Sequence, residues 1–229
     1  MKKGKIIPLV ILAVLLILAA GLYLFLHPWT QHLGADWPGN VYALHERTGT
    51  LVLFGEPEMN HKYIDYLAGS PTPEKWYSTM AIELGESRSQ VKQLVISEGI
   101  THVLGTLVPD FENLQEVWIP ASVIRIGARG NYPSGDVFGN AYVKTIYFCG
   151  DAPQLDSLTF RNMHTDPKDL TIVHKPGAKG FDTEPWQQFH VVEQDFSCPH
   201  SRLGWLTKAY YVAKSLILTF TGEYLPTEG

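Results

Sequence analysis

Two segments near the middle of the chain decide the fold: LVISEGITHV at residues 94–103 and VWIPASVIRI at residues 117–126. Their apolar positions coincide at an offset of 23 residues, pairing Leu94 with Val117, Ile96 with Ile119, Ile100 with Val123 and Val103 with Ile126. Two further strand-like cores follow, Ile146-Tyr-Phe148 and Leu170-Thr-Ile172, at offsets of 29 and 24 residues. Repeats of about 20–29 residues are typical of leucine-rich-repeat solenoids.

Each of these units contributes one short strand whose alternate residues point inward, and no unit can bury them alone. Stacking parallel strands about 4.8 Å apart turns the inward residues into a continuous apolar ladder. The second apolar pair of each unit, such as Ile100 and Val103, closes the coil from the other side. The sequence therefore predicts a β-rich leucine-rich-repeat solenoid of short parallel strands, with about four coils over residues 91–192.

The segments around the solenoid are less regular. Residues 27–40 contain two prolines and two glycines and are predicted to be a juxtamembrane linker. Residues 41–90 are predicted to form an N-terminal cap with a β-hairpin, because two apolar runs (41–44 and 50–54) flank a turn that ends at Gly49. In the tail, 193–229, apolar residues from Trp205 to Phe220 follow helical spacing. We expect this tail to form a helical cap on the solenoid, and a helix on the outer leaflet and a disordered or strand-forming tail are the alternatives.

The amino-terminal end is predicted to cross a membrane. In residues 6–26 only Pro8 and Gly21 are not apolar and nothing is charged. Twenty-one residues of helix span about 31 Å, the thickness of the hydrocarbon layer. Three lysines precede the stretch, so the positive-inside rule places residues 1–5 in the cytoplasm and the C-terminal domain outside the cell. A cleaved signal peptide and a buried soluble helix are the alternative interpretations.

Charge and motifs argue against several function classes. The chain carries a formal net charge of −5, and without the three lysines of the amino end residues 27–229 carry −8, which argues against nucleic acid and an anionic bilayer surface as partners. Its nine histidines are scattered, with no pair three or four residues apart, so we expect no metal site. Neither Gly-x-Ser-x-Gly nor His-Glu-x-x-His occurs. We therefore expect no cofactor and no enzyme activity, and a membrane-anchored hydrolase stays a remote alternative.

Two cysteines cannot form a disulfide framework. Outside the cell, however, Cys149 and Cys198 could pair with one another. Strand alternation points Cys149 away from the core, because Ile146 and Phe148 point inward.

The residues between the inward positions form the candidate binding site. One outward column is predicted to hold one residue per coil, namely Val95, Trp118, Tyr147 and Thr171. The next outward column is predicted to hold Gln93, Glu116, Thr145 and Asp169. Stacked strands turn such columns into exposed stripes, and extended solenoids bind partners on such faces. The alternative is that Trp118 and Tyr147 are cross-strand neighbours that only stabilise the sheet.

The order of these motifs resembles a known family over roughly residues 41–191. The run IPASVIRIG at 119–127, followed by VFGN at 137–140 and VKTI at 143–146, is similar to the BspA-type leucine-rich repeat of bacterial surface proteins. The resemblance implies a solenoid displayed outside a bacterial cell, with no catalytic residues. The expected function is a membrane-anchored, outward-facing interaction module that binds a protein or glycan partner. A structural subunit of a cell-envelope assembly is the alternative.

Overall fold

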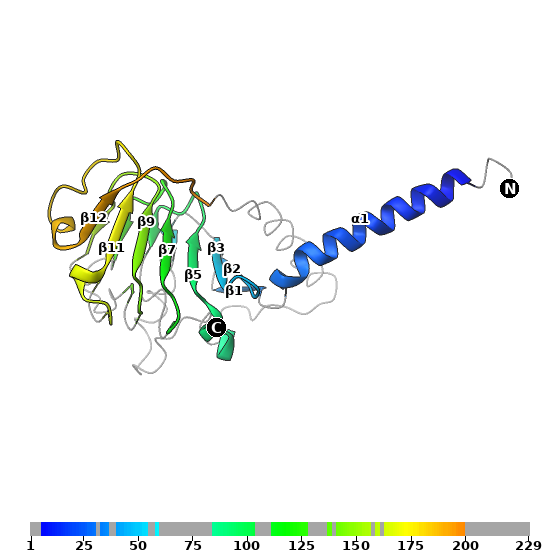
Figure 1. Ribbon diagram of the computed structural model, residues 1–229, viewed down its shortest axis with the longest axis horizontal. Helices are drawn as coiled ribbons and strands as arrows, with labels where there is room; N and C mark the ends of the chain where they lie inside the picture. Colours follow the sequence, from blue (N-terminus) through cyan, green and yellow to red (C-terminus); the bar gives the residue numbers. More distant parts are fainter. Residues whose placement is uncertain are drawn as a thin grey trace, which may run out of the picture.

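The computed structural model describes residues 6–30, 33–36, 40–54, 58–59, 84–103, 111–127, 137–138, 141–156, 159–160 and 163–199 (Figure 1). About half of these residues belong to two sheets and one helix. The larger, eight-stranded sheet has the order β1-β2-β3-β5-β7-β9-β11-β12. Its strands are β1 (Leu33–Asp36), β2 (Asn40–His45), β3 (Thr50–Phe54), β5 (Gln93–Ile96), β7 (Glu116–Ile119), β9 (Thr145–Phe148), β11 (Thr171–His174) and β12 (His190–Glu193).

The larger sheet is parallel from β3 to β12, and its strands pair in a continuous register. The aligned inward positions are Leu51, Leu94, Val117, Ile146 and Ile172, all completely or almost completely buried. The prediction of short parallel strands is thereby confirmed, and the sheet is consistent with a leucine-rich-repeat-like fold. The predicted hairpin is present as the antiparallel pair β2–β3, and β3 also serves as the first strand of the parallel series.

A second sheet closes the coils. It consists of β4 (Glu58–Met59), β6 (His102–Val103), β8 (Arg125–Ile126) and β10 (Gln154–Leu155), which pair in parallel. Val103 and Ile126 of this sheet are fully buried together with Ile100 and Val123. The second apolar pair of each unit therefore closes the core, as the sequence predicts. The described residues also form three short 3-10 helices: η3 (Gly85–Gln90), η4 (Pro167–Asp169) and η5 (Trp186–Gln188).

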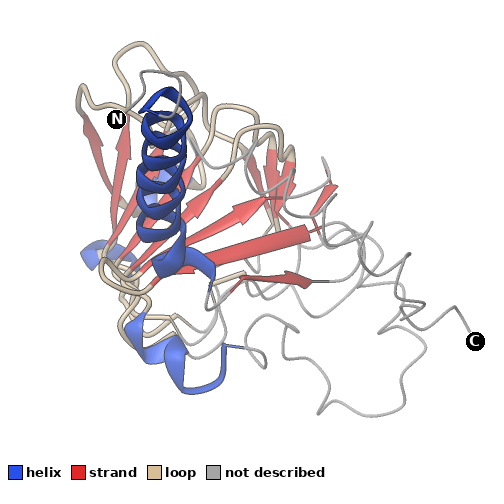
Figure 2. Cartoon of the chain, turned by 90° about the vertical axis from the view of Figure 1, so that its right-hand side faces the viewer, coloured by secondary structure: helices blue, strands red, loops and turns tan. Residues whose placement is uncertain are grey.

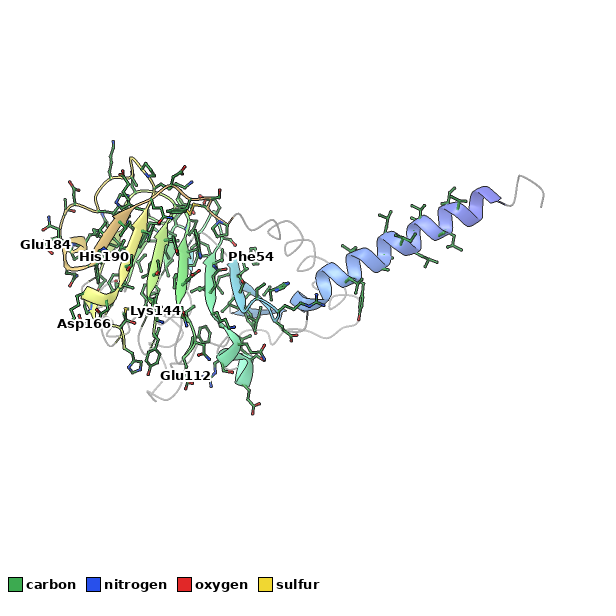
Figure 3. The ribbon with its side chains drawn as sticks, in the orientation of Figure 1. Phe54, Glu112, Lys144, Asp166, Glu184 and His190 are labelled. Atoms are coloured by element: carbon green, nitrogen blue, oxygen red, sulfur yellow. A yellow bond between two sulfur atoms is a disulfide. The ribbon has the colours of Figure 1, made fainter. Side chains whose placement is uncertain are left out.

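The helix α1 (Ile6–Thr30) runs away from the strands, with the amino end of the chain at its far tip (Figure 1). Seen from the α1 side, the helix stands in front of the strands (Figure 2). Its side chains over residues 10–24 are exposed and project outward around the helix (Figure 3). Counted over the residues that the structure describes, no helix is long and apolar enough to cross a bilayer. The structure does not support the predicted span at residues 6–26, which stays a prediction.

Two boundaries differ from those expected. Within the stretch 27–40, α1 continues to Thr30 and β1 pairs antiparallel with β2, so the described residues there belong to a helix and a strand. The strand β12 was not predicted, although Val191 and Val192 form a short apolar run. Residues 194–199 carry no helix, and the predicted helix from Trp205 to Phe220 lies outside the described residues.

Gly127 provides a test of how tightly the coils are packed. Its φ is +130°, and a Cβ there would overlap Asp156 Cβ and lie 2.8 Å from Thr159 Oγ1. Gly99 has a φ of +101°, but a Cβ there would meet nothing within 4 Å. We expect Gly99→Ala to cost about 1–2 kcal/mol from backbone strain alone. We expect Gly127→Ala to cost roughly 1–3 kcal/mol more, because overpacking adds to the strain.

Urea denaturation of both variants and the wild-type chain measures the urea concentration at which each is half unfolded. If the slope m is the same for all three, the difference in this midpoint gives the difference in stability. Equal midpoints for the two variants would show that the loop around Gly127 yields without cost, contrary to the packing described.

Candidate functional site: the outer face of the larger sheet

A line of polar side chains crosses the outer face of the larger sheet. We call it the polar column, and register assigns to it Thr50, Gln93, Glu116, Thr145, Thr171 and His190. All are half-buried except His190, which is exposed and lies at the β12 end of the sheet (Figure 3). The column therefore offers one polar side chain per strand, at the strand spacing of about 4.8 Å.

Hydrogen bonds order the first part of the polar column. Thr50 Oγ1 donates to Gln93 Oε1 (3.3 Å), and Gln93 Nε2 donates to Glu116 Oε2 (3.0 Å). At the far end Thr171 Oγ1 lies 3.5 Å from His190 Nδ1. The Gln93 amide is thereby fixed between two oxygens, and the remaining lone pairs of the Glu116 carboxylate can accept further hydrogen bonds.

Beside the polar column stand Trp118 and Tyr147, which we call the aromatic pair. They occupy equivalent positions on β7 and β9. Their rings stack with centroids 4.0 Å apart and planes 7° from parallel. In the same register, Val95 and Val173 flank them on β5 and β11 and are buried. The two rings thus stand upright in a column of apolar side chains, with their faces turned along the column.

The segment that follows β12 covers this column. Residues 194–199, which we call the strap, turn back after β12, and in Figure 1 their orange trace runs across the ends of β11 and β9. Phe196 contacts both members of the aromatic pair edge to face, with centroid distances of 5.6 Å to Trp118 and 5.5 Å to Tyr147. A disulfide joins Cys198 to Cys149, at the end of β9. Lys175 Nζ lies 5.8 Å from the Phe196 centroid, within the range of a cation–π contact.

The aromatic pair and the polar column interact electrostatically. Burial raises the pKa of the Tyr147 phenol above its ordinary value of 10.0, and the negative charge of Glu116 raises it further. Glu116 stands opposite Thr145, so Tyr147 is its diagonal neighbour on the same face of the sheet. The pKa of Tyr147 therefore depends both on the burial of its side chain and on the Glu116 carboxylate beside it.

The structure changes part of the predicted stripe. Val95 is only 3% exposed, so it is not available on the surface. Thr171 belongs to the polar column, because it pairs with Thr145 and not with Tyr147. Asp169 lies in η4, before the strand begins, and takes no part in either column. The reason is a register difference of two residues: Ile172, not Leu170, is the partner of Ile146.

Sequence reasoning missed Phe196 and His190. His190 belongs to β12, whose only signal is the short run Val191-Val192. Phe196 lies outside regular structure, and its sole clue is its position two residues before Cys198. Among the described residues, no group of His, Cys, Asp or Glu side chains is arranged to hold a metal ion.

Comparison with solved structures finds a likeness to a leucine-rich repeat protein from Eubacterium ventriosum, with a TM-score of 0.33 and 14% sequence identity. The match covers 69% of this chain and 42% of that one, so it spans less than half of that protein's length. No family model matches the chain, and no curated protein matches it. At this level the likeness carries no argument about function, and the description of the fold rests on the strand register.

The pKa of Tyr147 gives a direct test of the site. We expect Glu116→Gln to lower this pKa, because the substitution removes a negative charge, while burial keeps it above the ordinary value. Neutral Tyr147 stabilises the fold fully below the unfolded pKa of 10.0, and this contribution is lost as the pH rises through the higher folded pKa. An NMR titration of ¹³Cζ-labelled tyrosine reads the pKa directly.

Glu112→Gln is the matched control, because Glu112 is an exposed carboxylate in the turn that precedes β7 (Figure 3). This control should leave the pKa of Tyr147 where it is in the wild-type chain. An unchanged value in Glu116→Gln would contradict the proximity of the two groups.

Proposed function

We propose that this protein is a non-catalytic interaction module that binds a protein partner along the polar column of its larger sheet. The observation that carries the proposal is the column itself, which presents one polar side chain on each of six adjacent strands. Because the strands are held by buried apolar contacts on the inner face, these side chains keep fixed spacings before a partner arrives. Such preorganisation reduces the entropy lost on binding.

The chemistry of the column favours an extended polypeptide. The backbone of an extended chain presents N–H and C=O groups at regular intervals, and the column offers a carboxylate, an amide and hydroxyls that can meet them. The carboxylate of Glu116 is the strongest acceptor, since hydrogen bonds to an ionised group are roughly twice as strong as neutral ones.

A glycan partner is less well supported. Sugar rings are commonly held against the open face of an aromatic side chain. Here one face of each ring in the aromatic pair is covered by the other ring, and Val95 and Val173 take the flanking positions of the same column. Among the described residues the pair therefore presents edges, to which a sugar ring binds poorly.

The arrangement does not favour catalysis. The ionisable groups of the polar column, Glu116 and His190, are separated by β9 and β11 in the sheet order. General acid–base chemistry needs groups within hydrogen-bond reach of one reacting atom. Side chains spread along a line serve recognition better than they serve such chemistry.

The proposal also includes a family and a location in the cell. We propose a BspA-type leucine-rich-repeat protein, single-pass in the cell membrane, with its C-terminal domain outside the cell. The support is the motif order over residues 119–146 and the long run of exposed apolar side chains over residues 10–24. An exposed apolar surface of this extent is rare in soluble monomers and marks a binding or membrane surface.

The first test is capture of proteins from cell-envelope extract by the immobilised full chain. We expect Glu116→Lys combined with Thr145→Lys to lower the yield of the captured partner by roughly tenfold or more, because bulky like charges would replace the acceptors at the centre of the column. Quantitative mass spectrometry of the captured proteins measures the change.

Gln154→Lys controls for a lysine added elsewhere on the surface, since Gln154 is an exposed position in β10 of the second sheet. Equal capture by both variants would refute the polar column as the binding surface. Capture that survives protease treatment of the extract and disappears after glycosidase treatment would replace the protein partner with a glycan. Recovery of membrane neighbours alone would favour a structural subunit of an envelope assembly.

The membrane attachment has its own test. We expect the full chain to stay with the membrane pellet after an alkaline wash. Leu15→Lys with Leu16→Lys should release it, because each lysine near the middle of a span costs about 2.5–3.5 kcal/mol. Tyr142→Lys, at an exposed position of the strand-rich domain, controls for added charge. Release of the wild-type chain by the same wash would exclude the anchor.

A further inference from the structure

The strap occupies the part of the outer face where a partner would otherwise meet the aromatic pair. Phe196 places its ring perpendicular to both rings, at 78° to Trp118 and 76° to Tyr147. Perpendicular contacts at about 5–6 Å are a favourable arrangement of aromatic rings. The aromatic pair thus accommodates an aromatic side chain from an extended segment. In this structure that side chain is Phe196 of the same chain.

The strap is held at its two ends. Where it leaves β12, Gln194 N donates a hydrogen bond to the His174 carbonyl oxygen (2.9 Å). At the other end Cys198 is bonded to Cys149. Between these points, the contacts that the structure describes are those of Phe196 with the aromatic pair and with Lys175. The disulfide is therefore the one covalent restraint that keeps Phe196 in place.

One polar atom of the aromatic pair lacks a hydrogen-bond partner among the described residues. Trp118 Nε1 is buried and has no hydrogen-bond acceptor among the described residues. A buried N–H without an acceptor loses its hydration and gains nothing in return. Phe196 packs against the Trp118 ring, so displacing the strap would increase the access of water or a partner carbonyl to this side chain.

We propose that the strap is a disulfide-locked cover, and that reduction of Cys149–Cys198 by a dithiol opens it and frees the aromatic pair for an aromatic side chain of an extended polypeptide partner. The inference rests on the proposed function, because the freed pair lies beside the polar column and would extend the same binding surface. Both cysteines are half-buried, so the disulfide is not enclosed in the core.

The chemistry is thiol–disulfide exchange. A thiolate of the dithiol attacks one sulfur of Cys149–Cys198, that bond breaks, and a mixed disulfide forms. The second thiol of the dithiol, as its thiolate, then displaces the remaining cysteine sulfur. The dithiol leaves as its intramolecular disulfide, two electrons pass to the protein, and Cys149 and Cys198 each end as a protonated thiol.

Hydroxyl-radical footprinting of the full chain tests the cover residue by residue. The samples are the oxidised chain, the reduced and alkylated chain, and Cys198→Ser. We expect modification of Trp118 and Tyr147 to rise severalfold when the disulfide is absent. Trp186, which is 2% exposed in the core, is the internal control and should stay unmodified.

Two results would contradict the proposal that the disulfide holds the strap over the aromatic pair. If Trp118 stays protected without the disulfide, the bond does not hold the strap closed. If Trp186 becomes modified in parallel with Trp118, the disulfide maintains the fold as a whole. Phe196→Ala with the disulfide intact should expose Trp118 by itself, which separates the role of the ring from that of the bond.

A peptide tests the partner that the uncovered pair accepts. The probe is Gln-Asp-Phe-Ser-Ser-Pro, the sequence of residues 194–199 with serine in place of Cys198, carrying a photoreactive benzophenone analogue at its phenylalanine. We expect cross-links to residues 116–119 or 145–148 in Cys198→Ser and none in the oxidised chain. The unlabelled peptide should compete, and its Phe-to-Ala counterpart should not.

Absence of these cross-links in Cys198→Ser would refute the aromatic-side-chain part of the inference. The footprinting needs no partner, so it can succeed even where substitutions in the polar column leave capture unchanged. Failure of the proposed function and failure of the cover therefore give different results.

Discussion

Parallel alignment of the inward apolar ladder is the constraint on which the other features of this protein depend. Leu94, Val117 and Ile146 stack in register with no exposed surface. Each coil is too small to bury these side chains alone, so stability comes from contacts between neighbouring coils. A shift of one residue in any strand would turn its apolar side chains to the outer face. The same register that buries the ladder thus fixes which residues form the polar column.

The sequence predicts the ladder well because its signal is repeated, and it fails where one repeat breaks the pattern. Periodicity places the fourth strand two residues early, since Leu170 and Ile172 look like an inward pair. In the structure the inward pair is Ile172 and His174. His174 is buried and stacks on Phe181 with ring centroids 4.6 Å apart. A histidine that fills an apolar position by ring stacking cannot be recognised from periodicity alone.

The candidate site shows a second limit of sequence reasoning. Alternation correctly turns Trp118 and Tyr147 away from the core, but alternation says nothing about what covers the outer face. The cover comes from Phe196 in the strap, far along the chain from β7. The disulfide between Cys149 and Cys198 brings this segment back to the sheet, and sequence alone left that pairing open. Contacts between irregular segments and a sheet depend on tertiary structure, so no local pattern encodes them.

The two outward columns consequently have different characters, although they lie on the same strands. The rings of the aromatic pair stack within the protein, because they contact one another and Phe196. Beside this pair, the polar column keeps hydrogen-bonding capacity that no described residue uses, above all at the Glu116 carboxylate. A rigid parallel sheet holds the two at a constant separation, so a partner that binds the polar column is brought directly to the edge of the strap. Under the two proposals, recognition at the polar column and opening of the strap would therefore be neighbouring events on one sheet face.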